Sequence, residues 1–224
     1  MARYLGLDLT ASTARATAYA VLEDGCLAEH DLANDDDDIA GVVSRTKPEM
    51  VGIDAPLGLP RGLGCLEEPC ACGHCQLGPA KLRACELELR RRLGVGCFFT
   101  TKRSIIKGMV YRGMALRVRL ERVGCTVLEV YPYATRVVLW GKPPYRKQTV
   151  AGRTWTSQRL RGIVRGLPSQ HLGHDQADAV LAAYTCYLYA QGQAELLGGP
   201  DEGQICVPAR QGLMAPDSPC RPSP

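Results

Sequence analysis

Hydrophobic and polar residues alternate near the start of the chain, which is the pattern of β-strands. Leu5, Leu7 and Leu9 lie two residues apart and would share one face of a strand. The dipeptide Asp24-Gly25 favours a tight hairpin turn farther along. Short apolar runs in the middle of the chain predict two more strands. We therefore predict five strands, over residues 3–9, 14–22, 25–31, 49–54 and 125–130, and residues 204–207 are strand-like as well.

Apolar residues at helical spacing indicate helices between and after these strands. Asn34 is a candidate N-cap for the first helix, and the acidic run from Asp35 to Asp38 suits the positive end of the helix dipole. Almost every residue from Ala177 to Tyr189 is apolar, which predicts a helix buried on nearly all sides. We predict helices over residues 35–46, 79–93, 109–123, 155–166 and 177–189, with a basic loop over 141–153.

The remaining segments divide the chain into a domain, an insertion and a tail. A chain of 224 residues is long enough to bury one full core. We predict a single domain over residues 1–207, interrupted at about 56–78 by an irregular insertion rich in glycine, proline and cysteine. The last segment, 208–224, contains several prolines, and we expect it to be disordered.

Composition and charge narrow the class of protein. With 46% hydrophobic residues and no apolar stretch as long as a bilayer span, the sequence predicts a soluble, cytoplasmic protein without a membrane partner. The net charge is only +4, but the lysines and arginines gather between residues 81 and 165, which suits either nucleic acid or a solvated cationic surface. Lys102, Arg103 and Lys107 are candidate phosphate contacts, and 142–147 is a second basic segment. The oligomeric state stays open, with a homodimer as one option.

Four aspartates provide the candidate chemistry. Asp8 and Asp54 each end a predicted strand, whereas Asp175 and Asp178 precede or open the apolar C-terminal helix. The last two are three residues apart and share a face of a helix. Carboxylate oxygens suit hard cations, and several acids together can hold two ions at a phosphodiester. Each aspartate also has a structural explanation, as a strand-end acid bonded to a loop or as a helix-start residue.

Several motifs resemble known nucleases. Three antiparallel strands, a helix, a fourth strand and a closing helix with acids are similar to the ribonuclease H-like order. The late Asp-x-x-Asp is similar to the closing motif of RuvC-type resolvases. The chain resembles more closely an uncharacterised family of predicted nucleases of the ribonuclease H fold. That resemblance extends to about Pro208 and rests on Gly6 to Leu9, Ile53 to Leu57, Arg83 to Glu86, Glu129 to Pro132, His174 to Ala179, and Glu202-Gly203.

The resemblance implies both a fold and an activity. The fold would be α/β and ribonuclease H-like, a mixed five-stranded sheet with three antiparallel strands first, flanked by helices. The activity would be phosphodiester hydrolysis by a two-metal-ion mechanism, with Mg²⁺ or Mn²⁺ held by Asp8, Asp54, Asp175 and Asp178. Asp54 stands where RuvC itself has glutamate. Glu129 is a fifth candidate acid, which either joins the metal ligands or pairs with a buried arginine.

Cysteines gather in the insertion at a density that indicates a second metal. Cys65, Cys70, Cys72 and Cys75 fall within one short segment, with His74 among them. Thiolates grouped in this way suit Zn²⁺ or an iron–sulfur cluster, although the usual zinc pattern separates two Cys-x-x-Cys pairs more widely. The alternative is a set of free thiols on a loop. A structural metal that orders the insertion is the interpretation we favour, with Cys85 or His74 as substitute ligands.

Three functions remain compatible with these residues. A metal-dependent nuclease acting on nucleic acid accounts for most of them. A small-molecule phosphotransferase of the actin and sugar-kinase type shares the fold, and the segment from Leu7 to Ser12 resembles its first phosphate loop. Against it, the sequence has no second Asp-containing phosphate loop and is short for two such domains. The third function is a non-catalytic nucleic-acid-binding module, which the presence of all four aspartates disfavours.

Overall fold

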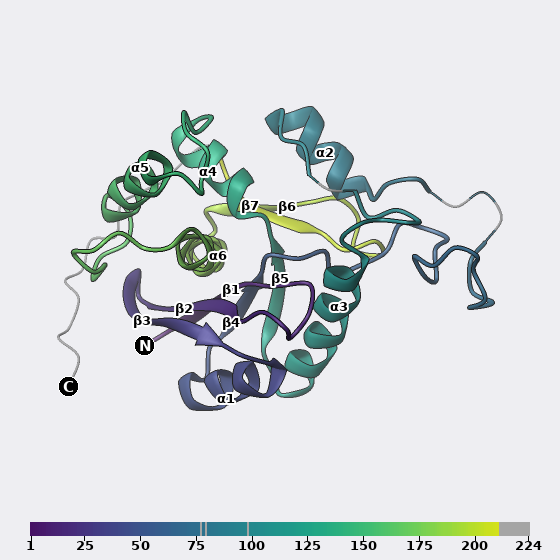
Figure 1. Cartoon of the computed structure of the whole chain (residues 1–224), viewed down its shortest axis with the longest axis horizontal. Helices are drawn as coiled ribbons and strands as arrows, with labels where there is room; N and C mark the ends of the chain where they lie inside the picture. Colours follow the sequence, from purple (N-terminus) through teal and green to yellow (C-terminus); the bar gives the residue numbers. More distant parts are fainter. Residues whose placement is uncertain (77, 79, 98, 211–224) are drawn as a thin grey trace.

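The computed structural model describes residues 1–76, 78, 80–97 and 99–210. These residues form one seven-stranded sheet with helices on both faces (Figure 1). The elements follow the chain as β1 (Arg3–Asp8), β2 (Thr17–Glu23), β3 (Cys26–Ala33), α1 (Asp36–Thr46), β4 (Met50–Ile53), α2 (Ala84–Leu93), α3 (Lys107–Arg122), β5 (Thr126–Val130), α4 (Pro132–Trp140), α5 (Val150–Arg161), α6 (His174–Ala190), β6 (Ala194–Leu197) and β7 (Ile205–Pro208).

The strand order confirms the ribonuclease H-like arrangement. The sheet runs β3-β2-β1-β4-β5-β7-β6, in which β2 is antiparallel to both β1 and β3, β4 is parallel to β1, and β5 is parallel to β4. The turn between β2 and β3 is the predicted one, because Asp24 and Gly25 both have positive φ, at 47° and 77°. The sheet has seven strands rather than the expected five, since the strand-like segment near residue 205 forms β7 and pairs parallel with β5, and β6 pairs antiparallel with β7.

Helices cover the two faces of the sheet unequally. Figure 1 shows α6 on one face, with α4 and α5 beyond it, and α1 and α3 on the other. Helix α6 packs unusually close, because Gly6 and Gly52 have no side chain to hold it away from β1 and β4. A Cβ on Gly6 would lie 2.0 Å from the Ala179 carbonyl oxygen, and one on Gly52 would lie 2.8 Å from that of Ala182. These glycines therefore set the distance between the sheet and the start of α6.

Several local predictions differ from the structure. The first helix is capped by Asp35, whose side chain accepts bonds from the Asp37 and Asp38 amides, rather than by Asn34. Helix α4 was not predicted, because Pro132 looks like the end of β5, whereas proline at the first helical position also starts a helix. Helix α5 begins at Val150, inside the expected basic loop.

The insertion and the residues after β7, as far as the structure describes them, lie outside the sheet and its helices. Between Ile53 and Ala84, the described residues contain no helix or strand, as expected for the insertion. Figure 1 shows this segment extending away from the sheet beyond α2 and α3. Strand β7 continues through Pro208, and the expected disordered tail lies outside the described residues from 211 onward. No helix among the described residues is long and apolar enough to cross a bilayer.

Candidate functional site

The fold brings the predicted aspartates to one edge of the sheet. Strands β1 and β4 are parallel neighbours, and the Asp54 amide donates to the Leu7 carbonyl at 2.9 Å, so Asp8 and Asp54 lie side by side at the strand ends. Helix α6 begins at the same edge and supplies Asp175 and Asp178 in its first turns. We call these four residues the acid site. Asp8, Asp54 and Asp178 line one cavity of about 620 Å³.

Burial and mutual repulsion characterise the acid site. Burial, the charges of Asp178 and Asp54, and a hydrogen bond with Asp175 together raise the pKa of Asp8 to about 9, with burial as the largest cause. Burial likewise raises the pKa of Asp54 to about 8, with Asp178 as the next cause. Without a bound cation, the site therefore disfavours full ionisation of its carboxylates. Such an arrangement costs stability and is typical of a site that holds a cation.

Asp178 already has two cationic partners. Its Oδ1 accepts a bond from the Arg136 guanidinium at 2.5 Å, and its Oδ2 accepts one from Lys147 Nζ at 2.6 Å. Arg136 comes from α4, and Lys147 comes from the loop before α5. Asp178 and Arg136 are almost fully buried, so this pair is held out of water. The sequence placed Lys147 in a basic segment, but it gave no signal that Arg136 reaches the acid site.

The remaining carboxylates fit a divalent cation. Among the described residues, Asp8 and Asp54 form no ion pair, although both are partly buried. Asp175 is half-exposed and lies 3.3 Å from His174 Nδ1. A set of carboxylate oxygens without nitrogen or sulfur donors matches the preference of Mg²⁺ and Mn²⁺. The chemistry of the donors therefore fits the ions expected from the sequence, with Asp8 and Asp54 as the principal candidates.

Glu129 belongs to a separate buried cluster. Both of its oxygens accept bonds of 2.7 Å from Arg83, and one also accepts from the Leu57 amide at 2.7 Å. Arg83 donates in addition to Glu86 at 3.0 Å. Glu202 bonds the Arg61 and Ala84 amides at 2.9 and 2.7 Å. Of the two roles expected for Glu129, these contacts favour the pairing with a buried arginine, although the residue also borders the cavity.

The three candidate phosphate contacts near residue 105 all face the insertion. Lys102 Nζ lies 3.4 Å from Cys65 Sγ and 3.3 Å from Cys75 Sγ. Arg103 pairs with Glu68 at 2.6 Å, and Lys107 pairs with Glu67 at 2.7 Å. These residues do not line the cavity of the acid site. Their contacts hold this segment against the insertion, and their contact with a phosphate stays a prediction.

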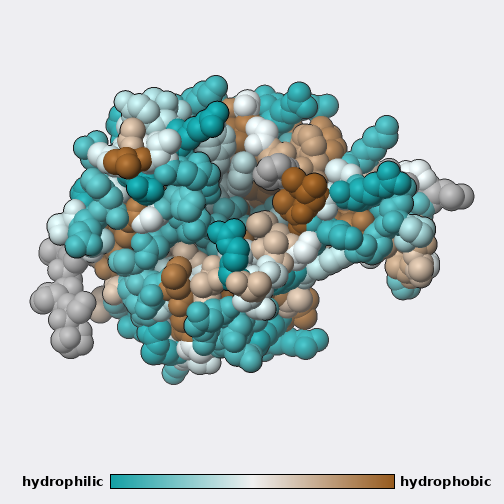
Figure 2. Space-filling view, in the orientation of Figure 1, coloured by the Kyte–Doolittle hydropathy of each residue, from teal (hydrophilic) through white to brown (hydrophobic). Residues whose placement is uncertain are grey.

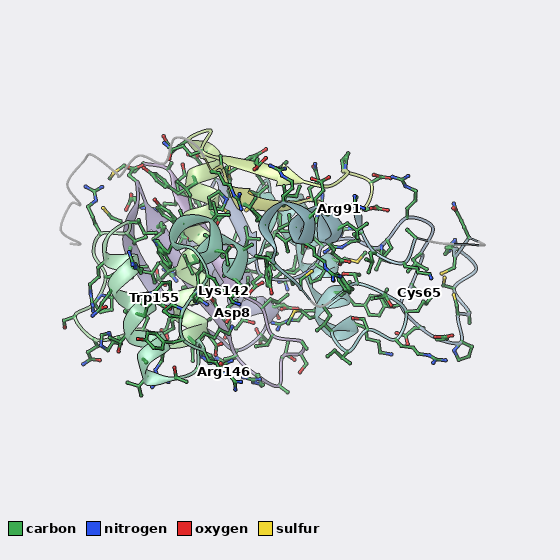
Figure 3. All side chains as sticks on the ribbon, turned by 90° about the horizontal axis from the view of Figure 1, so that it is seen from above. Asp8, Cys65, Arg91, Lys142, Arg146 and Trp155 are labelled. Carbon is green, nitrogen blue, oxygen red and sulfur yellow. The ribbon has the colours of Figure 1, made fainter. Side chains whose placement is uncertain are left out.

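The second basic segment does reach the acid site. Arg146 and Lys147 line the cavity together with Pro143, Pro144 and Tyr145. Figure 3, which labels Asp8, Lys142 and Arg146, shows all three in one region of the molecule, toward the same end as Trp155. Cavity walls also come from Tyr131 and Tyr133 at the junction of β5 and α4, and from Ile106 and Met109 beside α3.

The four predicted cysteines converge in the insertion. Their sulfur atoms all lie within 4.8 Å of one another, and they form the one such group of metal-ligating side chains among the described residues. Neighbouring sulfurs are 3.3 to 3.7 Å apart in the pairs 65–70, 70–72 and 72–75. The Gly64 amide donates to Cys75 Sγ at 3.3 Å, and this bond is the largest of several causes that together lower the pKa of that thiol to about 6. Cys85, a proposed substitute ligand, is instead buried in the core beside α4.

The cysteine cluster and the acid site are separate. Figure 3 shows Cys65 at one end of the molecule and Asp8 well away from it. The carboxylates are also less tightly gathered than the sulfurs.

Thr10 belongs to the loop that resembles a kinase phosphate loop. Its hydroxyl is used within the protein, because it donates to the Arg15 carbonyl oxygen and accepts from Arg112, at 2.8 Å each. That loop therefore offers a phosphate fewer free donors than the resemblance suggests.

Comparisons with known proteins identify one family model and a solved structure to which the chain is similar. A family model described as "Protein of unknown function (DUF429)" matches residues 6–203. No curated protein matches the chain. Among solved structures, the chain is similar to the Thermus thermophilus RuvC structure, with 15% identity, 85% of this chain and 96% of that chain covered, and a TM-score of 0.46. The family match includes all four aspartates and the insertion.

Proposed function

The chain belongs to the DUF429 family of proteins of unknown function, and we propose that it is a divalent-metal-dependent nuclease that hydrolyses phosphodiester bonds. One observation carries the proposal: Asp8, Asp54 and Asp178 line a single cavity that also contains Arg136, Arg146 and Lys147. Carboxylates alone would repel a phosphate. Carboxylates that hold cations, next to fixed arginine and lysine side chains, attract one.

Each charged residue of the cavity has a distinct part in this proposal. Asp8 and Asp54 are the main metal ligands, and Asp175 and Asp178 complete the set. When bound, a pair of Mg²⁺ or Mn²⁺ ions supplies the charge that activates the attacking water and stabilises the leaving oxygen. Arg136 holds Asp178 in position through its buried ion pair. Lys147 is half-exposed, so it can exchange its bond with Asp178 for one with a substrate phosphate.

Cleavage assays on labelled nucleic acid test the proposal. The purified protein should cut DNA or RNA oligonucleotides in Mg²⁺ or Mn²⁺ and stop on addition of chelator. Asp8→Asn and Asp54→Asn should each lower the rate by at least about 100-fold, because each removes a charged ligand at the reacting centre. Asp31→Asn, on the exposed edge strand β3, serves as the matched control and should keep full activity. Equal cleavage by the wild type and both cavity variants would refute the proposal.

We also propose that the four cysteines hold one structural Zn²⁺. A tetrahedral site with Zn–S bonds of about 2.3 Å places its sulfurs about 3.8 Å apart. The observed spacing of 3.3 to 3.7 Å between neighbouring sulfurs supports that geometry. An iron–sulfur cluster inserts several atoms between its cysteines and holds them farther apart. Lys102 and the Gly64 amide would offset the charge of the thiolates.

Elemental analysis of protein purified without oxygen tests the zinc proposal. About one equivalent of zinc and a colourless protein are expected. Cys72→Ser should release the metal and make the insertion sensitive to protease, since ligation and ordering of such loops are one event. Cys125→Ser, at a buried cysteine outside the cluster, should retain the metal. Metal-free protein with four titratable thiols in the insertion would count against the site.

A further inference from the structure

Three residues of the acid site, Asp8, Asp54 and Asp178, line a cavity. Walls rise around it from three directions: the loop of Pro143 to Lys147, the junction of β5 and α4, and the start of α3. The space-filling view shows a hollow near the centre of one face, with hydrophobic residues beside it (Figure 2). At about 620 Å³, the cavity falls in the range of sites for small molecules. A phosphodiester must enter this cavity to reach the aspartates.

Size decides which nucleic acids can enter. A nucleotide fits within about 300 to 1,000 Å³, which is the usual volume of a ligand pocket. An intact double helix is much wider than the cavity, and its bases are stacked and paired inside it. Enzymes that act on a nucleotide within an enclosed pocket therefore use single strands or turn the nucleotide out of the helix.

The walls of the cavity suit an unstacked base. Tyr131, Tyr133 and Tyr145 line it, together with Pro143 and Pro144. The rings of Tyr131 and Tyr133 are 6.1 Å apart, and the Tyr131 hydroxyl is fixed by a bond to the Gly96 carbonyl at 3.2 Å. Tyr145 is 53% exposed and forms no bond or ring contact among the described residues. Stacking on aromatic rings is how proteins hold single strands without reading their sequence.

The charges of the cavity suit the backbone of the same nucleotide. Arg136 lines the cavity, is 3% exposed, and leaves its Nε without a partner among the described residues. Arg146 and Lys147 border the cavity from the loop that also carries Tyr145. One loop thus presents an aromatic ring and two cations to the space above the aspartates. A nucleotide combines the two chemistries that this loop offers.

We propose that the cavity binds one unpaired nucleotide, with its phosphate at the aspartates and its base against Tyr133 and Tyr145. The substrate is then single-stranded nucleic acid rather than an intact duplex. This inference rests on the proposed nuclease function and narrows its substrate class. It assigns Tyr145 a direct contact with the base, and it requires no base-specific hydrogen bond.

The test compares binding of a single strand and a duplex of the same sequence. A labelled 12-nucleotide DNA, the same strand as RNA, and a blunt DNA duplex are titrated with the wild-type protein in Ca²⁺, with anisotropy as the readout. At least one of the single strands should bind at least tenfold more tightly than the duplex. A 2-aminopurine base in the strand should lose fluorescence on binding, because it stacks on tyrosine.

Variants of Tyr145 separate stacking from general loss of structure. Tyr145→Ala should weaken binding of the single strand about tenfold, as expected for the loss of one stacked ring. Tyr145→Phe keeps the ring and should bind like the wild type. Leu32→Ala removes a side chain of equal exposure, 52%, from the far edge of the sheet and should also bind like the wild type. Unchanged binding by Tyr145→Ala would overturn the assignment of the base to this wall.

The outcomes distinguish this inference from the nuclease proposal. If the duplex is bound and cut as well as the single strands, and Asp8→Asn abolishes the cleavage, the nuclease proposal stands and the single-strand inference is wrong. If no probe is bound or cut in any divalent metal, both are wrong. Preferential cleavage of the single strand, lost in Asp8→Asn and weakened in Tyr145→Ala, supports both.

Discussion

Replacing Arg83 by methionine should strongly destabilise the protein. Arg83 is 1% exposed and makes three side-chain bonds of 2.7 to 3.0 Å to Glu86 and Glu129, which are also buried. Methionine fills part of the space but leaves two carboxylates without their cation. Glu129 would retain only the Leu57 amide, and Glu86 the Thr100 amide together with the amide of residue 83. The perturbation therefore removes one partner of a buried ion pair while the other partners stay buried.

The expected loss follows from burial. Removal of one partner from a buried pair costs about 3–5 kcal/mol, and here one cation serves two acids, so we expect about 4 kcal/mol or more. For a chain of this size, that loss lowers the melting temperature by about 10 °C. The matched control is Arg45→Met, because Arg45 forms the same two-bond pair with Glu29 on the surface. Its side chain is 55% exposed, and its loss should cost less than about 1 kcal/mol.

Equilibrium unfolding in urea, with a check that the slope is unchanged, measures both variants. Arg83→Lys keeps the charge without the paired geometry and should fall between the wild type and Arg83→Met. If Arg83→Met lies within about 1 kcal/mol of the wild type, or loses no more than Arg45→Met, the buried cluster is not what stabilises this region. The assignment of Glu129 to a structural role would then also fail.

Four further outcomes test the site and its packing. Without divalent metal, the free energy of unfolding should fall as pH rises from about 4 to about 9, because folded Asp8 and Asp54 hold protons that the unfolded chain releases. Unfolding assays at pH 5 and 8 measure this fall, and Asp8→Asn should reduce it. Lys147→Ala should tighten Mn²⁺ binding about tenfold in calorimetry, because Lys147 competes for Asp178; weaker binding would contradict this. Gly6→Ala should cost about 3 kcal/mol on chemical denaturation, because its Cβ meets the backbone of α6, whereas Gly41→Ala, with open space around it, should cost nothing. Binding of nucleic acid should weaken steeply between 50 and about 200 mM salt, and a flat response would exclude phosphate contacts.

The sequence predicted the parts of the fold in which pattern and structure are local. Alternation identified β1, and the Asp24-Gly25 pair identified the hairpin, because both signals depend on neighbouring residues alone. Strand β6 was missed because four residues give no periodicity, and its pairing with β7 depends on distant parts of the chain. Helix α4 was missed because a proline after a strand was interpreted as an end. The apolar residues after Pro132 were the signal that would have found it.

Local sequence pattern predicted the aspartates of the acid site but not the residues that contact them. Asp8 and Asp54 were predictable because parallel strands end at the same edge, and Asp178 because it opens a buried helix. The partners of Asp178 depend on where a missed helix and a loop come to lie, and no local pattern encodes that. For Lys102, the sequence shows a cation, which suits phosphate, but no local pattern indicates that the fold places its Nζ 3.4 Å from Cys65 Sγ and 3.3 Å from Cys75 Sγ.

The motifs that carry the family resemblance fall into two groups, the aspartates of the acid site and the residues of the buried ion-pair cluster. The aspartates supply the proposed chemistry. Glu129 instead connects β5 to Arg83 and to the start of the insertion at Leu57. Glu202 accepts bonds from the Arg61 and Ala84 amides, and Gly58 permits its close approach because a Cβ there would lie 2.3 Å from the Glu202 carbonyl oxygen. Glu129 bonds the amide of Leu57, three residues after Asp54. The buried cluster therefore fixes the turn that follows Asp54, a proposed metal ligand.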